Sequence, residues 1–245
     1  MPEERAKILP FYLVIDVSWS MDGEQLQNAG NIMPELSDAL AKDPILTDKI
    51  RFALIDFAGD AQVRLPLCDV LDPDVVLPGL ACRGATSYAA AFRLLRKEIE
   101  ANVTQLKADG FSVHRPAVFF LTDGVPTDAD DEWNSAFREL TEYDRQAGVG
   151  FAMYPNVIPF GVKDADPQVL RRLVHPSTGA KQSRMYLMDE GNNPAQAIAG
   201  MAEIMVSSVL SSGANLAGGD SGLIHPDPAD LPAGITAANA DGDFL

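Results

Sequence analysis

The sequence predicts a three-layer, Rossmann-like α/β domain, with helices on both faces of a mostly parallel central sheet that has one antiparallel edge strand. Short apolar runs alternate along the chain with longer amphipathic segments, a pattern typical of strand–helix–strand units. The first apolar run, at 11–15, is continuous and not alternating, as expected for a strand buried on both faces. Residues 50–57 and 61–67 flank the turn signal Gly59-Asp60, so they predict a hairpin and hence the antiparallel edge.

The remaining elements follow from length and periodicity. Further strands are expected at 117–121, 156–160 and 184–188. Apolar residues at steps of three and four predict helices, at 24–41, 88–107, 130–147, 167–174 and 194–211. Asp166 is a suitable N-cap for the fourth of these helices, with Pro167 at its first position.

Composition limits the possible partners. The chain has 245 residues, of which 47% are hydrophobic and 22% charged, as in ordinary globular domains. The formal net charge is −16. Nucleic acid and anionic membrane surfaces are therefore unsuitable partners, because binding to phosphate requires clustered Lys and Arg.

One folded domain is predicted over residues 1–211. Residues 212–245 are rich in Gly, Ala, Pro and Asp and contain no Lys or Arg, so they predict a disordered acidic tail. The apolar stretch 195–216 is interrupted by Glu203 and by Ser and Gly residues, which favours a soluble helix over a membrane span. No signal peptide is visible, and Cys68 and Cys82 form no Cys-x-x-Cys pair, so we expect reduced thiols in a cytoplasmic protein.

Polar oxygens gather where three predicted elements meet. Asp16, Ser18 and Ser20 follow the first strand, Thr86 precedes the second large helix, and Asp123 ends the strand at 117–121. In an open α/β sheet, ligands bind beyond the carboxyl ends of the strands, where the strand order reverses. Two carboxylates and three hydroxyls form a hard, all-oxygen set that favours Mg²⁺ or Mn²⁺. Neutral hydroxyl ligands would leave the ion seeking one more anionic oxygen, such as a carboxylate.

The residues Asp16-x-Ser18-x-Ser20, Thr86 and Asp123 resemble the metal-ion-dependent adhesion site of von Willebrand factor A-type domains in order and spacing. The resemblance covers roughly residues 10–211. It implies that Ser18, Ser20 and Thr86 contact the metal, with Asp16 and Asp123 bound directly or through water. It also implies that the protein docks a partner protein, whose Glu or Asp completes the coordination, and that it catalyses no reaction.

Three further segments resemble the bacterial tellurium-resistance TerY-like branch: 85–88, 121–128 and 160–162. Members of that branch are linked to metal-stress clusters and to phosphorylation signalling. Arg83-Gly84-Ala85 departs from the pattern, because a Gly-Gly pair is common before the threonine.

Each feature also has a simpler interpretation. Ser20, Thr86 or Ser87 can serve only as helix caps, and Asp123 can stabilise a turn with Gly124. Trp19 suits either packing on the sheet rim or a partner contact. The alternative function is a metal-dependent hydrolase or phosphatase using the same site, but no His or Lys adjoins the motif as a base.

Overall fold

The computed structural model describes residues 5–178, 182–218 and 222–241. Its main sheet has the order β10-β9-β8-β5-β1-β2-β3, with the short β4 (Ser112–Val113) beside the start of β1. The seven strands of that order are β1 (Lys7–Asp16), β2 (Ile50–Phe57), β3 (Ala61–Cys68), β5 (Ala117–Thr122), β8 (Asn156–Gly161), β9 (Met185–Met188) and β10 (Ile235–Ala238). Among the described strands of this sheet, only the edge pairs β2–β3 and β9–β10 are antiparallel.

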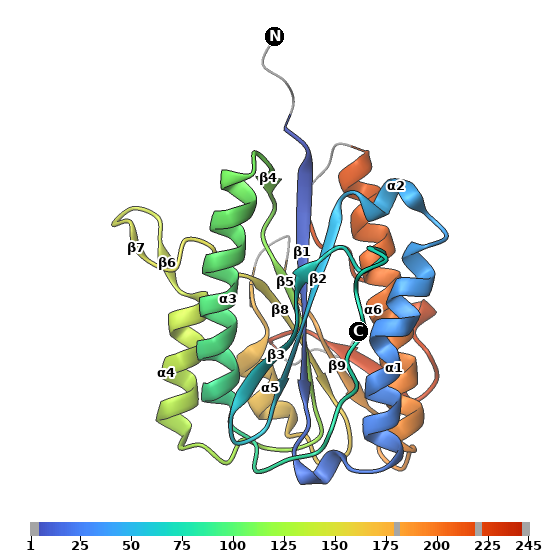
Figure 1. Ribbon diagram of the computed structural model, residues 1–245. Helices are drawn as coiled ribbons and strands as arrows, with labels where there is room; N and C mark the ends of the chain where they lie inside the picture. The colour runs from blue at the N-terminus through green and yellow to red at the C-terminus, as the bar shows by residue number, and fades with distance from the viewer. Residues whose placement is uncertain (1–4, 179–181, 219–221, 242–245) are drawn as a thin grey trace.

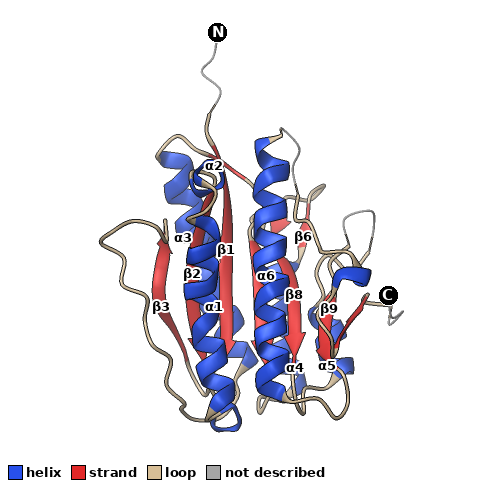
Figure 2. Ribbon diagram, turned by 90° about the vertical axis from the view of Figure 1, so that its right-hand side faces the viewer, coloured by secondary structure: helices blue, strands red, loops and turns tan. Residues whose placement is uncertain are grey.

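Helices cover both faces of the sheet, as Figures 1 and 2 show. One face carries α1 (Glu24–Leu40), α2 (Pro44–Thr47) and α6 (Pro194–Ala217). The other carries α3 (Tyr88–Ala108), α4 (Asp130–Thr141) and α5 (Pro167–Leu173). Two short 3₁₀ turns, η1 (Trp19–Met21) and η2 (Pro228–Asp230), lie in the connections.

The central strand β1 separates two hydrophobic cores. Phe11, Leu13 and Ile15 point into the core under α1 and α6. Tyr12 and Val14 point into the core under α3 and α4. Both faces are covered, and the strand's continuous apolar run follows from this double burial.

The predicted fold class is confirmed, including the antiparallel edge strand, which is β3. Most predicted elements lie within a few residues of their expected bounds, and β2 has the bounds that the sequence predicts. The opposite edge adds an antiparallel strand, β10, that the sequence analysis does not anticipate.

The helix predicted over 130–147 is too long, because α4 ends at Thr141. The chain then forms a small hairpin of β6 (Tyr143–Asp144) and β7 (Val149–Gly150). The Asp144 carboxylate accepts hydrogen bonds from the amides of Gln146 and Ala147, an alternative to helical pairing that Asp offers readily. Gly150 has φ +100°, and a Cβ there would lie 2.4 Å from the Glu142 carbonyl oxygen, so this turn requires glycine.

The tail predicted to be disordered from residue 212 differs most from the structure. Helix α6 continues to Ala217, and β10 pairs with β9, with Ile235 opposite Met188. Ile235 and Ala237 join the core under α6. A Cβ on Gly200 would lie 2.8 Å from Ile235 Cδ1 and 3.1 Å from Pro232 Cβ, so the returning chain packs closely on α6. Residues 219–221 and 242–245 of the predicted tail lie outside the described residues.

Helix α6 is long and apolar enough to cross a membrane by length and composition alone, and 61% of its most apolar window is buried inside the fold. Ile198, Met201 and Met205 are fully buried in the core that α6 shares with α1. Its apolar surface is therefore largely used in packing against the sheet and α1, as Figure 2 illustrates.

Deletion of residues 219–245 should destabilise the domain, by about 2–4 kcal/mol, because it removes the buried Ile235 and Ala237 and exposes the edge of β9. Thermal and urea denaturation of the full chain, the truncated chain and an Ile235→Ala variant measure the effect. Equal melting temperatures for the three proteins would show that β10 contributes nothing to stability.

Candidate metal centre

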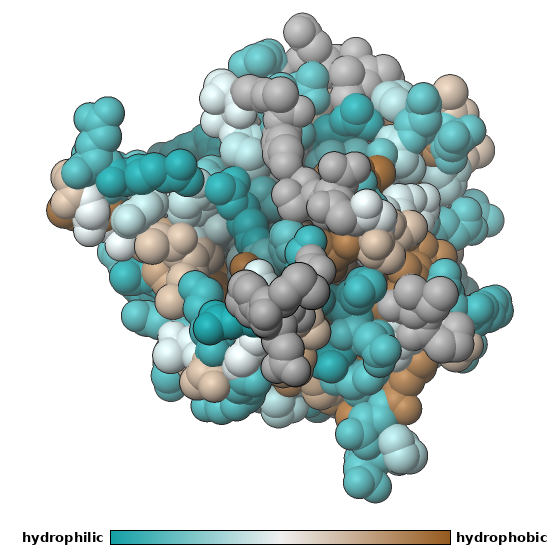
Figure 3. All heavy atoms as spheres, turned by 90° about the horizontal axis from the view of Figure 1, so that it is seen from above, coloured by the Kyte–Doolittle hydropathy of each residue, from teal (hydrophilic) through white to brown (hydrophobic). Residues whose placement is uncertain are grey.

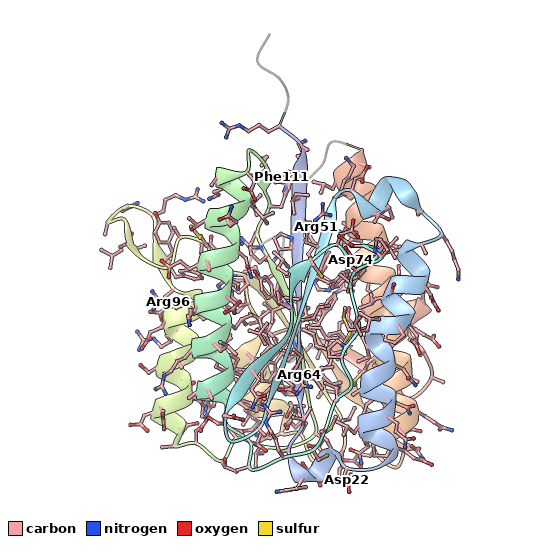
Figure 4. All side chains as sticks on the ribbon, viewed as in Figure 1. Asp22, Arg51, Arg64, Asp74, Arg96 and Phe111 are labelled. Carbon is pink, nitrogen blue, oxygen red and sulfur yellow. The ribbon has the colours of Figure 1, made fainter. Side chains whose placement is uncertain are left out.

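The five candidate ligand residues lie at the carboxyl ends of β1 and β5 and in the loop before α3. Strands β1 and β5 are neighbours, and from β1 the chain moves one way to β2 and β3 before returning to β5 on the other side. This is the point where the strand order reverses, the usual ligand site of open α/β sheets. In Figure 4 these strand ends lie at the bottom of the molecule, where Asp22, the residue that follows η1, is labelled. The opposite end, seen in Figure 3, presents mostly hydrophilic side chains with smaller hydrophobic areas.

Four of the five candidates form one hydrogen-bonded chain. The Ser18 amide donates to Asp16 Oδ1 at 2.9 Å, and the Ser18 and Ser20 hydroxyls lie 3.0 Å apart. Ser20 Oγ then donates to Asp123 Oδ1 at 2.6 Å. The structure therefore brings together oxygens that are 107 residues apart in sequence, from Asp16 to Asp123.

Thr86 occupies the neighbouring loop, which is tied to the others through the backbone. The Arg83 amide donates to the Val17 carbonyl at 2.8 Å, and the Trp19 amide to the Gly84 carbonyl at 3.4 Å. Thr86 is 7% exposed. Within the described part of the chain, its hydroxyl forms no hydrogen bond with the other four candidates, so its side chain is not committed to them.

Two further residues, which the sequence analysis missed, support Asp16. Thr122 Oγ1 donates to Asp16 Oδ2 at 2.7 Å. The Tyr88 hydroxyl lies 3.2 Å from Thr122 Oγ1 and 2.9 Å from the Gly124 carbonyl oxygen. Thr122 directly precedes Asp123 in the sequence. The alternation of side-chain directions along β5 was the only available sign that the two residues contact different neighbours.

The unusual Arg83 has a structural role. Its guanidinium lies 2.7 Å from the fully buried Asp56 carboxylate of β2 and 2.9 Å from Asp60. Arg64 of β3 also reaches Asp56, at 3.4 Å. These ion pairs fix the loop that carries Thr86 onto the β2–β3 hairpin. The neighbouring Gly84 has φ +59°. A single glycine, in place of the Gly-Gly pair, thus adopts the left-handed backbone of this loop.

A lysine that the sequence analysis did not select also contacts the site. Lys163, just after β8, places its Nζ 3.7 Å from Asp123 Oδ2 and donates to the Ser20 carbonyl at 3.1 Å. The first separation is an ion pair without a hydrogen bond. Asp123 Oδ2 is buried and accepts no hydrogen bond from any described residue.

Burial disfavours the ionised form of both carboxyl groups and so raises their pKa values. It raises the pKa of Asp16 to about 6, opposed by the hydrogen bonds from Ser18 and Thr122 and reinforced by the charge of Asp123. Burial also raises the pKa of Asp123, opposed by Ser20 and Lys163. Two acids close together under a protein surface are costly to ionise, and a bound cation reverses that cost.

The donor set fits a hard divalent cation. It consists of carboxylate and hydroxyl oxygens, the ligands of Mg²⁺ and Mn²⁺, and the buried Asp123 Oδ2 is short of a donor. Among the described residues, no three side chains of the His, Cys, Asp and Glu types gather as a metal site. The candidate site therefore depends on its hydroxyls. Ordinary N/S zinc coordination has no support in this donor set.

The rim of the site combines exposed apolar groups with paired acids. Trp19 is 67% exposed and Val125 is 51% exposed, so Trp19 does not pack on the sheet rim. In the acidic run 128–132, Asp128 accepts from the Ala89 amide at the start of α3. Asp130 forms an ion pair with Arg172, and Glu132 with Arg93, so these acids fasten helices together.

Two of the histidines contact aromatic rings. His175 contacts the Pro155 carbonyl and the Tyr154 ring. His225 packs against Tyr186, and burial lowers its pKa to about 4. Cys68 and Cys82 are both free.

Comparisons with known proteins identify the architecture. Residues 11–125 match the von Willebrand factor type A domain family. No curated protein matches the sequence. Among solved structures, the fold resembles proximal thread matrix protein 1 from the mussel byssus with a zinc-occupied MIDAS motif, at 14% identity and TM-score 0.54. It also resembles the pilus adhesin SpaC from Lactobacillus rhamnosus GG, at 12% identity and TM-score 0.56.

Each comparison covers 84% of this chain, which spans 49% of the thread matrix protein and 30% of the adhesin. At these identities the likeness concerns the fold.

The raised pKa of Asp16 predicts how the metal-free protein depends on pH. The Asp16 carboxyl is ordinarily ionised above about pH 3.8, but in the fold only above about pH 6. The protonated carboxyl therefore contributes fully to the free energy of unfolding below about pH 3.8, and this contribution is lost as the pH rises through about 6. The loss amounts to roughly 3 kcal/mol at neutral pH. Asp16→Asn should therefore raise the melting temperature in chelator at neutral pH and reduce its dependence on pH between about 4 and 6.5.

Thermal denaturation in EDTA across this pH range measures the effect, with Asp74→Asn as a control for the change of charge in an exposed loop. If wild type and Asp16→Asn melt with the same pH dependence, ionisation of Asp16 does not destabilise the fold.

Proposed function

Since residues 11–125 match the von Willebrand factor type A domain family and the fold is of that type, we propose that this protein is a metal-dependent protein-binding module. Asp16, Ser18, Ser20, Thr86 and Asp123 would hold one Mg²⁺ or Mn²⁺ ion. When bound, the ion would supply a coordination position for a Glu or Asp carboxylate of a partner protein. The observation that carries the proposal is the chain of contacts from Asp16 through Ser18 and Ser20 to Asp123.

The chain's own residues prepare this site. Thr122 and the Ser18 amide orient the Asp16 carboxylate, and the Arg83–Asp56 pair fixes the loop of Thr86. The hydroxyl of Thr86 is not engaged by the other candidates among the described residues, which suits a direct ligand. Ser18 is nearly buried whereas Ser20 is exposed, so the site opens on the side of Ser20.

The exposed Trp19 adds an apolar contact next to this opening. Tryptophan is enriched among the residues that contribute most to protein interfaces. A partner that places a carboxylate near Ser20 and an apolar side chain on Trp19 would use both features. With a net charge of −16, the protein would repel such a carboxylate if no cation were present.

The absence of enzymatic activity is part of this proposal. Among the described residues, the groups that donate hydrogen bonds to the side chains of the five candidates, or form ion pairs with them, are hydroxyls, a backbone amide and the Lys163 ammonium. An assay of phosphate-ester hydrolysis with Mg²⁺ or Mn²⁺ distinguishes the docking module from a hydrolase.

We further propose a cytoplasmic role in a bacterial metal-stress or signalling system, which rests only on the TerY-like segments 85–88, 121–128 and 160–162.

Saturating Mg²⁺ or Mn²⁺ should stabilise the wild-type protein, by about 1–3 kcal/mol, because an ion that binds only the folded state shifts the equilibrium by mass action. Asp16→Ala should abolish this gain. Thermal denaturation with metal and with EDTA measures both effects. Wild-type melting that ignores Mg²⁺, Mn²⁺ and EDTA alike would refute the metal site.

Thr86→Ala should weaken partner binding while the domain stays folded, because it removes one small ligand from a loop that the backbone holds in place. A partner captured from native lysate in a chelator-sensitive manner is purified, and its affinity is measured with Mg²⁺ and with EDTA. Thr104→Ala, an exposed threonine of α3, is the matched control. A partner that binds Thr86→Ala or the chelated protein as tightly as wild type would place the interface elsewhere.

A further inference from the structure

Lys163 occupies an uncommon backbone position. Its φ is +54°, and among the described residues no other non-glycine residue has a positive φ. Left-handed backbone is unfavourable for a lysine, and such positions persist when the surroundings impose them. Here the Val162 amide donates to the Thr122 carbonyl, and the Asp164 amide to the Asp123 carbonyl. The turn after β8 is therefore fastened on both sides of Lys163 to the end of β5.

This backbone directs the lysine side chain to the candidate metal centre. The Nζ atom reaches the Ser20 carbonyl at 3.1 Å and Asp123 Oδ2 at 3.7 Å. The Asp123 side chain is fully buried, whereas 34% of the Lys163 side chain is exposed. The ammonium thus lies at the solvent side of the buried carboxylate, within reach of both water and the acid.

The charge balance gives this contact a specific consequence. Asp16 and Asp123 are two buried acids in one site, and the only ion pair that a described residue makes with either is that of Lys163 with Asp123. An ammonium beside Asp123 compensates part of its negative charge. A divalent cation bound by the same carboxylate would be repelled by that ammonium at short range.

We propose that Lys163 is an internal counter-ion of the metal centre, which stabilises Asp123 while no metal is bound and which a divalent ion must displace from that carboxylate. The inference rests on the proposed function and adds a control of metal affinity to it. Lys163 therefore lowers the affinity for the ion, and the site fills only at a higher free metal concentration than its oxygen ligands alone would require.

The test compares two substitutions that remove the charge in different backbone contexts. Lys163→Met keeps the side-chain length and the backbone strain, and Lys163→Asn introduces a residue that tolerates left-handed backbone. Lys163→Arg keeps the charge. Lys97→Met, at an exposed site in the middle of α3, controls for the change in net charge. Calorimetric titration gives the dissociation constant for Mn²⁺ and Mg²⁺, and thermal denaturation in EDTA gives the stability of the metal-free protein.

Both neutral variants should bind the ion about three- to tenfold more tightly than wild type, the effect expected when one ion pair is removed. Lys163→Met should also melt at a lower temperature than wild type in EDTA, whereas Lys163→Arg and Lys97→Met should resemble wild type in both measurements. Unchanged or weaker metal binding by Lys163→Met and Lys163→Asn overturns the proposal. Tighter binding by only one of them also overturns it, because the effect would then come from the backbone.

The outcome separates this inference from the proposed function. If wild type binds metal and both neutral variants bind it with the same affinity, only the role of Lys163 is refuted. Metal binding by the neutral variants alone supports the counter-ion and explains why wild type requires more metal. If neither wild type nor the neutral variants bind Mg²⁺ or Mn²⁺, both proposals fall.

Discussion

The two parallel ladders that share β1 are the constraint on which this structure depends. Pairing with β2 on one side and β5 on the other places the strand inside the sheet, and the helices on both faces bury its residues 8–16. Asp16 ends that strand inside the fold, where a carboxylate needs donors. The Ser18 amide and the Thr122 hydroxyl supply them, so the geometry of the candidate site follows from the pairing of the central strand.

Much of this arrangement could be predicted, because the signals are local. The bounds of β2 follow from a mostly apolar segment that ends just before the turn signal Gly59-Asp60. Asp16, Ser18 and Ser20 follow directly from the strand that precedes them. Thr122, Arg83 and Lys163 were less accessible to sequence reasoning. Their roles depend on partners such as Asp56 and Asp123, which lie 27 and 40 residues away from Arg83 and Lys163. A lysine in a left-handed turn after a strand has no periodicity that reveals it.

The same distinction explains the errors at the end of the chain. Ile235-Thr236-Ala237-Ala238 is too short and too weakly apolar to predict a strand by itself. It becomes one because β9 offers an edge and because Gly200 on α6 leaves room for Ile235 and Pro232. Composition described the segment correctly as rich in Gly, Ala, Pro and Asp, whereas the tertiary contacts determined its structure.

The position of β10 also bears on how the domain avoids unwanted association. An unpaired strand edge is a template for pairing with another chain, and the outer edge of β9 is paired with residues that lie 47 to 53 positions later in the sequence. Proteolytic cleavage between α6 and β10 would expose the β9 edge and the apolar contacts of Ile235 together. The C-terminal segment thus replaces β9 at the edge of the sheet and covers apolar surface on α6, and its loss would be expected to promote aggregation through that exposed apolar surface.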